Sequence, residues 1–306
     1  MLLEDALEEY KYHCLAKGYT KKTMKNKHQE YKQLKEYLQK KRAITHLEQV
    51  THHDLKAYVR QKQIAGLKPQ SIVSTAKQVI AFFNWCVKEE YLQENPMDKV
   101  TLPKVPKKLV EGFTPDEVQR MIDVWSNKDY LECRNKAIIA MMADCGLRSM
   151  EIRGLLTKNV KDTTILVHGK GNKDRVVFIS PMLKKILIKY ERLKKDYFKG
   201  KIMGSDKYFL SYQGYGLSHV GIYNLVKEAG KRAGVEDAHP HKFRHFYSVQ
   251  SITSGNLDVY SLSQLLGHSD ISVTQNYLRS LNTKQLMEKA NASSPLMNMV
   301  KGGGNK

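Results

Sequence analysis

The first 94 residues place apolar side chains at helical spacing and show little of the alternation that marks a strand. The spacing predicts one helix over residues 2–16, which stops at Gly18, and a second helix from Thr20 to about residue 40. Both helices are too short for a coiled coil, so they indicate a small globular bundle.

Two further helices complete this bundle. Thr51, followed by Asp54 three residues later, resembles a capping box that opens the third helix. The fourth helix follows Pro69, and its apolar face consists of Ile72, Val79, Phe82, Phe83 and Val87. Four helices of this size predict a small helical domain over residues 1–100.

A break in the pattern follows at residues 94–108, ENPMDKVTLPKVPKK. This stretch has three prolines and four lysines and no helical periodicity, which is typical of an extended linker. We assign the linker to residues 101–112. Directly after it, Thr114, Pro115 and Glu117 form a strong helix-start signal that opens a second domain.

The second domain is predicted to be mostly helical, with one exception. Residues 163–168 and 175–180 are β-rich runs joined by a Gly/Asn/Asp turn, so they predict a β-hairpin with Lys170 and Lys173 at its tip. Later helices are expected to start near Ser218, His241, Val259 and Ser272. The fold class is therefore mainly α with a small β-hairpin, in two domains.

Charge changes this picture, because the chain is strongly basic. Its 51 Lys and Arg against 31 Asp and Glu give a net charge of +20. Residues 1–110 contribute 21 − 12 = +9 and residues 111–306 contribute 30 − 19 = +11. A polyanion that contacts both domains is the simplest partner, and a basic protein kept soluble by its charge is the alternative.

The sequence gives little support for a membrane protein, a disulfide-rich protein or a metal-binding protein. No apolar run approaches the ~20 residues that cross a bilayer, and the N-terminus is acidic, so cytoplasmic residence is expected and no membrane partner. Four widely spaced cysteines form no C-x-x-C pair, and Cys86 and Cys145 suit a reduced core. His239, His241 and His245 are dense, but the intervening Lys and Arg would repel a cation, so no metal is expected.

Four stretches of the second domain carry candidate chemistry. CGLRSMEIRGL contains Arg148 and Glu151, and HGKGNKDR is the hairpin tip. HPHKFRHF places His241 and Arg244 on one helical face, and SQLLGHSDISVTQNYL contains His268 and, nine residues later, Tyr277.

These residue types suit phosphoryl transfer without a metal. Two guanidiniums can hold the non-bridging oxygens of a phosphodiester bidentately, where other enzymes use Mg²⁺. A tyrosine attacks phosphorus if a neighbour accepts its proton and nearby cations favour the phenolate. A lysine on the hairpin can protonate the leaving sugar oxygen.

In these stretches the chain resembles the tyrosine recombinase (phage integrase) family, in the subgroup of Xer recombinases and mobile-element integrases. The family pattern is filled in order by Arg148 with Glu151, Lys170, His241 with Arg244, His268 and Tyr277. Each of these signals alone is weak, whereas the six catalytic residues Arg148, Lys170, His241, Arg244, His268 and Tyr277 in this order are specific.

The resemblance implies a role for each of these residues. Arg148 and Arg244 would clamp the scissile phosphate, and Lys170 would be the general acid toward the 5′-hydroxyl. His241 would accept the proton of Tyr277, which would form a 3′-phosphotyrosyl link. His268 would hydrogen-bond a phosphate oxygen, and Glu151 would orient the arginine or the histidine. The reaction needs neither ATP nor another cofactor.

The resemblance also implies an architecture and partners. Residues 1–100 would be a SAM-like core-binding domain, residues 113–285 the catalytic integrase domain, and residues 286–306 a tail whose helix could dock on a neighbouring protomer. The two domains would close on double-stranded DNA with inverted-repeat core sites. Two protomers would bind one site, four would form the synapse, and accessory proteins are possible.

DNA contacts are assigned from position alone. Residues 21–42 carry nine basic and two acidic side chains, and a solvated face is the alternative to a DNA-contacting helix. The residues selected as contacts are Lys22, Lys25, Lys68, Gln70, Ser71, Lys77 and Lys173.

Several alternatives stay open. Lys173 could replace Lys170 as the acid, Glu151 with Arg148 could be an ordinary surface ion pair, and Tyr277 could simply pack against Val273. The chain could also be a type IB topoisomerase, which nicks and closes one strand, or a catalytically silent, sequence-specific DNA-binding regulator. The sequence specifies neither the DNA target nor whether a phage, a transposon or a chromosome is served.

Overall fold

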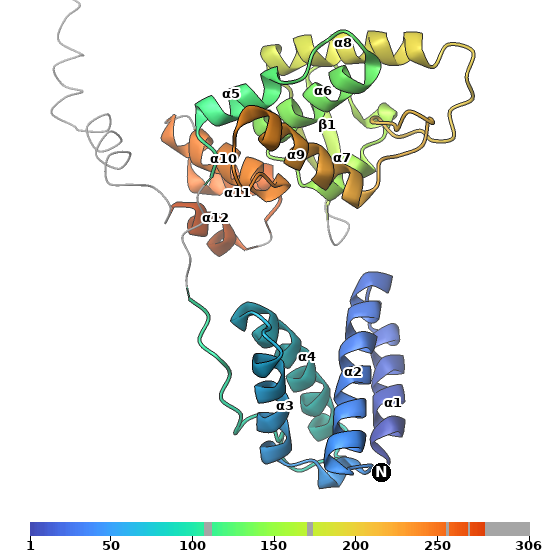
Figure 1. Cartoon of the computed structure of the whole chain (residues 1–306), viewed down its shortest axis with the longest axis vertical. Helices are drawn as coiled ribbons and strands as arrows, with labels where there is room; N and C mark the ends of the chain where they lie inside the picture. Colours follow the sequence, from blue (N-terminus) through green and yellow to red (C-terminus); the bar gives the residue numbers. More distant parts are fainter. Residues whose placement is uncertain (107–111, 170–173, 255–256, 269, 279–306) are drawn as a thin grey trace, which may run out of the picture. The chain divides into compact units, whose positions relative to one another are not determined.

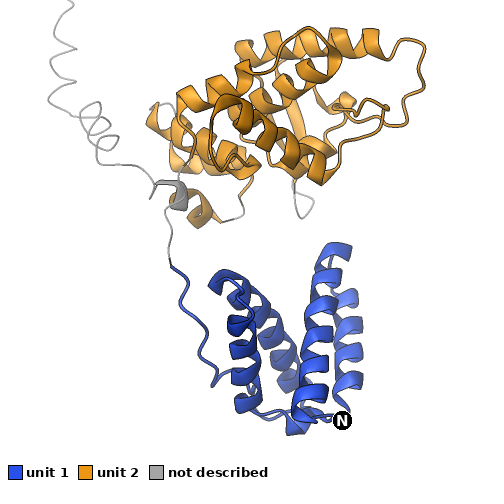
Figure 2. Cartoon of the chain, viewed as in Figure 1, with its two compact units in different colours: residues 1–108 blue, residues 109–306 orange. Residues whose placement is uncertain are grey.

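A computed structural model describes residues 1–106, 112–169, 174–254, 257–268 and 270–278, with only the backbone for residues 276–278. The chain divides into two compact units, residues 1–108 and residues 109–306 (Figure 2). Helices dominate both units, and one two-stranded antiparallel sheet lies in the second (Figure 1). The mainly α fold with a small β-hairpin is therefore confirmed.

The first unit is a helical bundle with a continuous apolar core, to which residues such as Leu34, Leu38, Phe82 and Phe83 contribute. Its elements are α1 (Leu3–Ala16), α2 (Lys21–Arg42), the 3₁₀ helix η1 (Leu47–Gln49), α3 (His52–Ile64) and α4 (Pro69–Lys88). Helix α4 packs against α1, α2 and α3, so the most apolar of these helices lies at the centre of the bundle.

The predicted helix starts of this unit rest on observed caps. The hydroxyl of Thr20 accepts a hydrogen bond from the Thr23 backbone N–H at 3.2 Å. The Asp54 carboxylate accepts from the Thr51 backbone N–H at 3.0 Å, which is the reciprocal half of a capping box. These side chains satisfy N–H groups that have no partner within the helix, and so they define where each helix begins.

One basic residue of the 21–42 stretch does not belong to a solvated face. Lys27 is buried, and its Nζ donates hydrogen bonds to the hydroxyls of Tyr10 at 3.2 Å and Tyr31 at 3.0 Å. Burial lowers the pKa of Lys27. The charge pattern of this helix alone could not separate such an inward lysine from its exposed neighbours Lys22 and Lys25.

The second unit surrounds a larger core. Its elements are α5 (Pro115–Asp123), α6 (Tyr130–Cys145), α7 (Ser149–Gly154), η2 (Thr157–Asn159), β1 (Thr164–His168), β2 (Asp174–Phe178), α8 (Pro181–Tyr197), α9 (His219–Ala233), α10 (Pro240–Thr253), α11 (Val259–Leu266) and α12 (Ile271–Leu278). Helix α6 is buried on nearly every side from Ala137 to Met142, and it packs against α5, α8 and α10. The end of α6 therefore has a well-determined position in the core.

The hairpin pairs β1 with β2 in antiparallel register, with Val167 opposite Arg175. Ile165, Val167 and Val177 face the core, while the alternate positions face outward. Strand β2 ends at Phe178, two residues earlier than its β-rich sequence suggests. The reason is that Ser180 caps α8, accepting a hydrogen bond from the Leu183 backbone N–H at 3.1 Å.

Some predicted features fall outside the described residues, namely Lys170, Lys173 and the tail at residues 286–306. The four cysteines are buried and none forms a disulfide, which agrees with the core positions expected for Cys86 and Cys145. Within the part of the chain that is described, no helix combines the length and the apolar character needed to span a membrane.

Candidate active site

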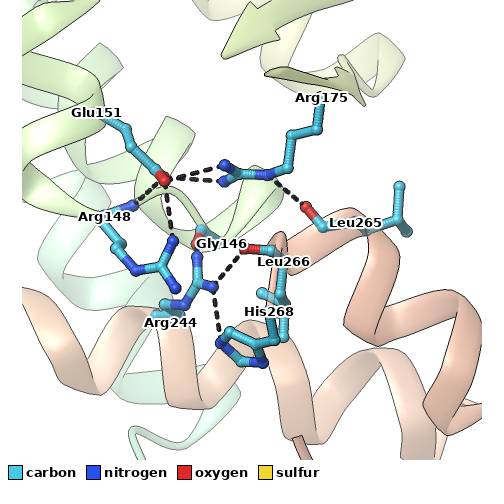
Figure 3. Close-up of polar contacts among 8 residues, drawn as sticks. All are labelled: Gly146, Arg148, Glu151, Arg175, Arg244, Leu265, Leu266 and His268. Atoms are coloured by element: carbon cyan, nitrogen blue, oxygen red, sulfur yellow. Dashed lines mark hydrogen bonds and ion pairs between the residues drawn. The ribbon is translucent and has the colours of Figure 1, made fainter. Parts of the chain in front are cut away.

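Most of the predicted catalytic residues converge at one end of the second unit. Arg148 is the N-cap of α7 and Glu151 lies in its first turn, while His241 and Arg244 are on α10. His268 follows the end of α11, and Tyr277 lies in α12, where its backbone alone is described. Figure 3 shows Arg148, Glu151, Arg244 and His268 gathered around this end of the core.

A tight turn after α6 positions Arg148. Gly146 ends the helix with a φ of +60°, in the left-handed region that favours glycine. A Cβ on Gly146 would lie only 2.4 Å from the Tyr247 ring of α10. Glycine is therefore required twice, for the turn and for the close approach of α10. The Gly-Leu-Arg motif follows from this geometry.

Glu151 organises the arginine. Its carboxylate accepts hydrogen bonds from the Arg148 backbone N–H at 2.8 Å and from the Arg148 guanidinium at 3.0 Å. The Glu151 side chain is 6% exposed, and that of Arg148 is 34% exposed. The pair is therefore more than a surface ion pair, because a buried carboxylate orients a guanidinium that still reaches solvent.

A second arginine, Arg175 of β2, completes the surroundings of Glu151. It donates to both carboxylate oxygens at 2.9 Å. Burial alone would raise the pKa of Glu151, but the hydrogen bonds and charge of Arg175, followed by those of Arg148, outweigh burial and lower it. Glu151 is therefore ionised at neutral pH.

Arg175 was missed by the sequence reasoning, although a signal existed. The alternation in β2 puts Arg175 on the same face of the hairpin as the buried Val177. A charged residue at an inward strand position requires a partner. That partner, Glu151, lies 24 residues earlier in the chain, and no local pattern connects the two.

Arg244 is held by backbone oxygens. Its guanidinium donates to the Gly146 carbonyl at 2.8 Å and to the Leu266 carbonyl at 2.6 Å, and the residue is only 2% exposed. These carbonyls lie at the C-terminal ends of α6 and α11, where the helix dipole favours a positive charge. Arg244 thus ties α10 to the ends of two other helices.

His268 is directed toward Arg244 by the turn that ends α11. Gly267 adopts a φ of +64°, and the His268 backbone N–H bonds to the Ser263 carbonyl at 3.1 Å, so the cap and the site share one turn. The Arg244 guanidinium donates to His268 Nε2 at 2.9 Å. Because arginine has no acceptor, Nε2 carries no proton, and Nδ1–H donates to the Thr274 hydroxyl at 2.7 Å.

Thr274 links this histidine to the predicted nucleophile. Thr274 is fully buried on α12, and Tyr277 follows it by one helical turn. The bond from His268 therefore fixes the tautomer of the imidazole and holds α12 against the site.

The pKa of His268 yields a prediction about stability. Burial first, and then the charges of Arg244, Arg148 and Arg175, lower the pKa of His268 from 6.5 to about 4. In the unfolded chain this histidine takes up a proton near pH 6.5. Between these two values the unfolded state binds more protons, so the free energy of unfolding decreases as the pH falls through this window and is unaffected by His268 above it.

Denaturant unfolding of the wild type and of His268→Gln, followed from about pH 7 to about pH 4.5, tests this expectation. The variant should lose less stability over this range than the wild type does, because it lacks the titrating imidazole. Equal losses in the two proteins would contradict the assignment of a neutral His268.

His241 lies at the start of α10, on the exposed side of the site. The protein packed around its ring, and then the charges of Arg244, His239 and Arg148, lower its pKa. A neutral imidazole that is open to solvent can accept a proton at neutral pH. His245, by contrast, is 2% exposed, as suits a structural histidine.

The remaining predicted residues belong to the first unit or lie outside the described residues. All six predicted DNA contacts of the first unit are exposed, two on α2, one at the N-cap of α4 and three on α4: Lys22, Lys25, Lys68, Gln70, Ser71 and Lys77. Lys170 and Lys173 lie outside the described residues. Within the described ranges, no group of three or more His, Cys, Asp or Glu is arranged to hold a metal ion.

Comparison with known proteins finds the same family that the sequence motifs indicate. The profile of the phage integrase family matches residues 111–284. The tyrosine recombinase XerC of Lactobacillus leichmannii is 30% identical over 266 residues, which cover 85% of this chain and 89% of the relative. XerC of Vibrio cholerae is 28% identical over 283 residues, which cover 90% of this chain and 89% of the relative.

Solved structures share the fold. A lambda integrase dimer (residues 75–356) bound to a COC′ core site matches with a TM-score of 0.73 and 16% identity, over 92% of this chain and 97% of that one. XerH recombinase bound to a palindromic difH substrate, in a post-cleavage complex, matches with a TM-score of 0.71 and 20% identity. The match covers 88% of this chain and 79% of that one.

Proposed function

The chain belongs to the phage integrase family of site-specific tyrosine recombinases, and we propose that it cleaves and rejoins DNA through a 3′-phosphotyrosyl link to Tyr277. One observation carries the proposal: two guanidiniums, those of Arg148 and Arg244, are held in one site by a buried carboxylate and by helix-end carbonyls. Cations that are positioned in advance stabilise the charge that develops on a phosphorane.

In the proposed reaction, the Tyr277 oxygen attacks the scissile phosphorus. A P–O bond to tyrosine forms as the P–O5′ bond breaks, and the DNA strand leaves as a 5′-hydroxyl. His241 accepts the phenolic proton, which its lowered pKa and its exposure permit. Attack by a 5′-hydroxyl of another strand reverses the step, so bond energy is conserved and no energy source is required.

The general acid is proposed to be Lys170, which would protonate the departing O5′, with Lys173 as the alternative. Both lie in the sequence between the paired strands β1 and β2, where a lysine of the connecting segment is expected. The end of the hairpin at which β1 leads into β2 contacts the site through Arg175 and Glu151, since Arg175 lies one pair from the last pair, His168 with Asp174. This arrangement supports an acid on the hairpin without distinguishing the two lysines.

His268 acts in the proposal through Arg244. Its Nε2 accepts from the Arg244 guanidinium and its Nδ1–H donates to Thr274, so in this arrangement the ring steadies the arginine. Direct donation from His268 to a phosphate oxygen, the role expected from the sequence, requires these two hydrogen bonds to rearrange when DNA binds.

The proposed partner is double-stranded DNA with inverted-repeat core sites. The related XerH and lambda integrase structures contain DNA, and the latter include a dimer on a core site and a tetramer on a Holliday junction. By this similarity we expect two protomers on one site and four in the synapse. The net charge of +20 and the exposed basic residues of α2 and α4 support DNA binding by the first unit.

The trans-docking tail, accessory proteins and cytoplasmic residence stay part of this proposal. DNA as the proposed substrate supports residence in the cytoplasm.

Covalent trapping tests the proposed function. Inverted-repeat duplexes are first selected from a random pool by binding to the full chain. A nick is then placed beside the candidate cleavage point, so that the released 5′-hydroxyl fragment diffuses away. Denaturing electrophoresis should show a protein–DNA adduct of undiminished yield in EDTA. Absence of the adduct, or its appearance only with Mg²⁺, would overturn the proposal.

A further inference from the structure

Arg175 joins three segments of the second unit that are distant in sequence. It belongs to β2, it binds the Glu151 carboxylate of α7 with two hydrogen bonds of 2.9 Å, and its Nε donates to the Leu265 carbonyl of α11 at 2.7 Å. Its side chain is 9% exposed and that of Glu151 is 6% exposed. A planar guanidinium satisfies all three acceptors at once, which the single ammonium group of a lysine cannot do with the same geometry.

The contact with α11 is unusually close. A Cβ on Gly267 would lie 2.9 Å from Arg175 Cδ, so the glycine that ends α11 also leaves room for this side chain. The Leu265 and Leu266 carbonyls at this helix end receive Arg175 and Arg244, respectively. One helix terminus therefore anchors both arginines, where its dipole favours positive charge.

Arg175 also keeps Glu151 ionised, and the ionised carboxylate orients the Arg148 guanidinium. Without Arg175, the Glu151 carboxylate would keep Arg148 as its one charged hydrogen-bond partner. Burial would then raise the pKa of Glu151 and favour the protonated carboxyl group. A protonated Glu151 would no longer hold the Arg148 guanidinium as an anion. The orientation of Arg148 thus depends on Arg175, which lies 24 residues after Glu151.

We infer that Arg175 is a positioning residue for strand cleavage, which acts through Glu151 on Arg148 and aligns the connected end of the hairpin with the end of α11. This inference rests on the proposed role of Arg148 at the scissile phosphate. Arg175 itself needs no contact with DNA, because both ends of its fork are occupied by protein acceptors.

A double-mutant cycle tests the inference. Arg175→Gln, Glu151→Gln and the double variant are compared for the single-turnover rate of covalent adduct formation on the nicked duplex, with enzyme saturating. Each single change should slow cleavage about 10- to 100-fold, while the double variant should be no more than about threefold slower than the slower single one. The affinity for DNA should change by less than about threefold in all three, since no phosphate contact is lost.

Two further variants make the result specific. Arg175→Lys keeps the charge but loses the fork, so it should recover only part of the rate. Arg192→Gln removes an exposed arginine of α8 and should cleave like the wild type. Circular dichroism and thermal unfolding identify the fraction of folded protein to which each rate is normalised.

The outcomes separate cleanly. If the two single effects multiply in the double variant, Arg175 does not act through Glu151 and the inference is wrong. The inference also fails if Arg175→Gln cleaves at the wild-type rate. If the wild type itself forms no adduct, the proposed function fails instead.

Discussion

Replacing Tyr277 by phenylalanine should abolish the covalent protein–DNA adduct and leave DNA binding intact. The change removes one oxygen atom, and that oxygen is the proposed nucleophile. We expect adduct formation to fall by at least about 10³-fold, to the detection limit of the gel. Thr274 still packs α12 against the site in this variant, so the helix should stay in place.

The matched control is Tyr223→Phe, an exposed tyrosine of α9 that is not among the candidate site residues. It should form the adduct at the wild-type rate. An adduct that persists in Tyr277→Phe would assign the nucleophile to another residue. If the wild type and Tyr277→Phe behave alike in binding and neither forms an adduct, the chain is a DNA-binding regulator without catalytic activity.

The same pair of proteins addresses the topoisomerase alternative. A type IB topoisomerase would relax supercoiled plasmid as a monomer with little sequence preference. A recombinase should exchange strands between two copies of its selected site and should assemble on them. Both activities should disappear in Tyr277→Phe. The wild-type protein distinguishes the two alternatives by which substrate it converts, the supercoiled plasmid or the pair of selected sites.

Replacing Arg244 should affect both stability and catalysis. Arg244→Gln leaves the Gly146 and Leu266 carbonyls and His268 Nε2 without the shared donor that they have in the wild type. Leaving buried acceptors unsatisfied is costly, and we expect the free energy of unfolding to fall by about 2–4 kcal/mol. Cleavage should fall below detection, since the second phosphate-binding cation is gone.

Arg244→Lys separates the two effects. Lysine keeps the positive charge near the helix ends but cannot reach the three acceptors with one planar fork. Its stability should lie between those of the wild type and Arg244→Gln, whereas its cleavage should stay at least about 100-fold reduced. Urea unfolding and the trapping assay provide the two measurements, with Arg192→Gln as the control for loss of an arginine. Unchanged stability in Arg244→Gln would contradict the burial of this guanidinium.

Local sequence was sufficient for the elements whose signals are short-range. Helices begin directly after Thr20, Thr51 and Thr114 as predicted, because a helix-start signal involves only the few residues that follow it. The hairpin followed from its two β-rich runs and from the Gly, Asn and Asp residues between them. The ends of β2 and the start of α8 were less predictable, because the Ser180 cap competes with the strand for the same residues.

The order of the candidate residues along the chain was equally visible in the sequence, and so was the chemistry that their types allow. Their number, identity and spacing indicated a tyrosine recombinase, and the comparisons show that family. The individual roles of Arg148, His241 and Tyr277 stay predictions, because the structure places these residues without testing what they do.

Only the tertiary structure decided which groups these residues contact. Arg244 meets a carbonyl 98 residues away, and Arg175 meets a carboxylate and a carbonyl from two different helices. Such pairings arise because α10 packs against α6 and α11 while β2 packs against α11, and no periodicity within one segment encodes them. The types of residue needed for phosphoryl transfer were thus set by sequence, whereas their orientation and charge state depend on buried contacts made across the fold.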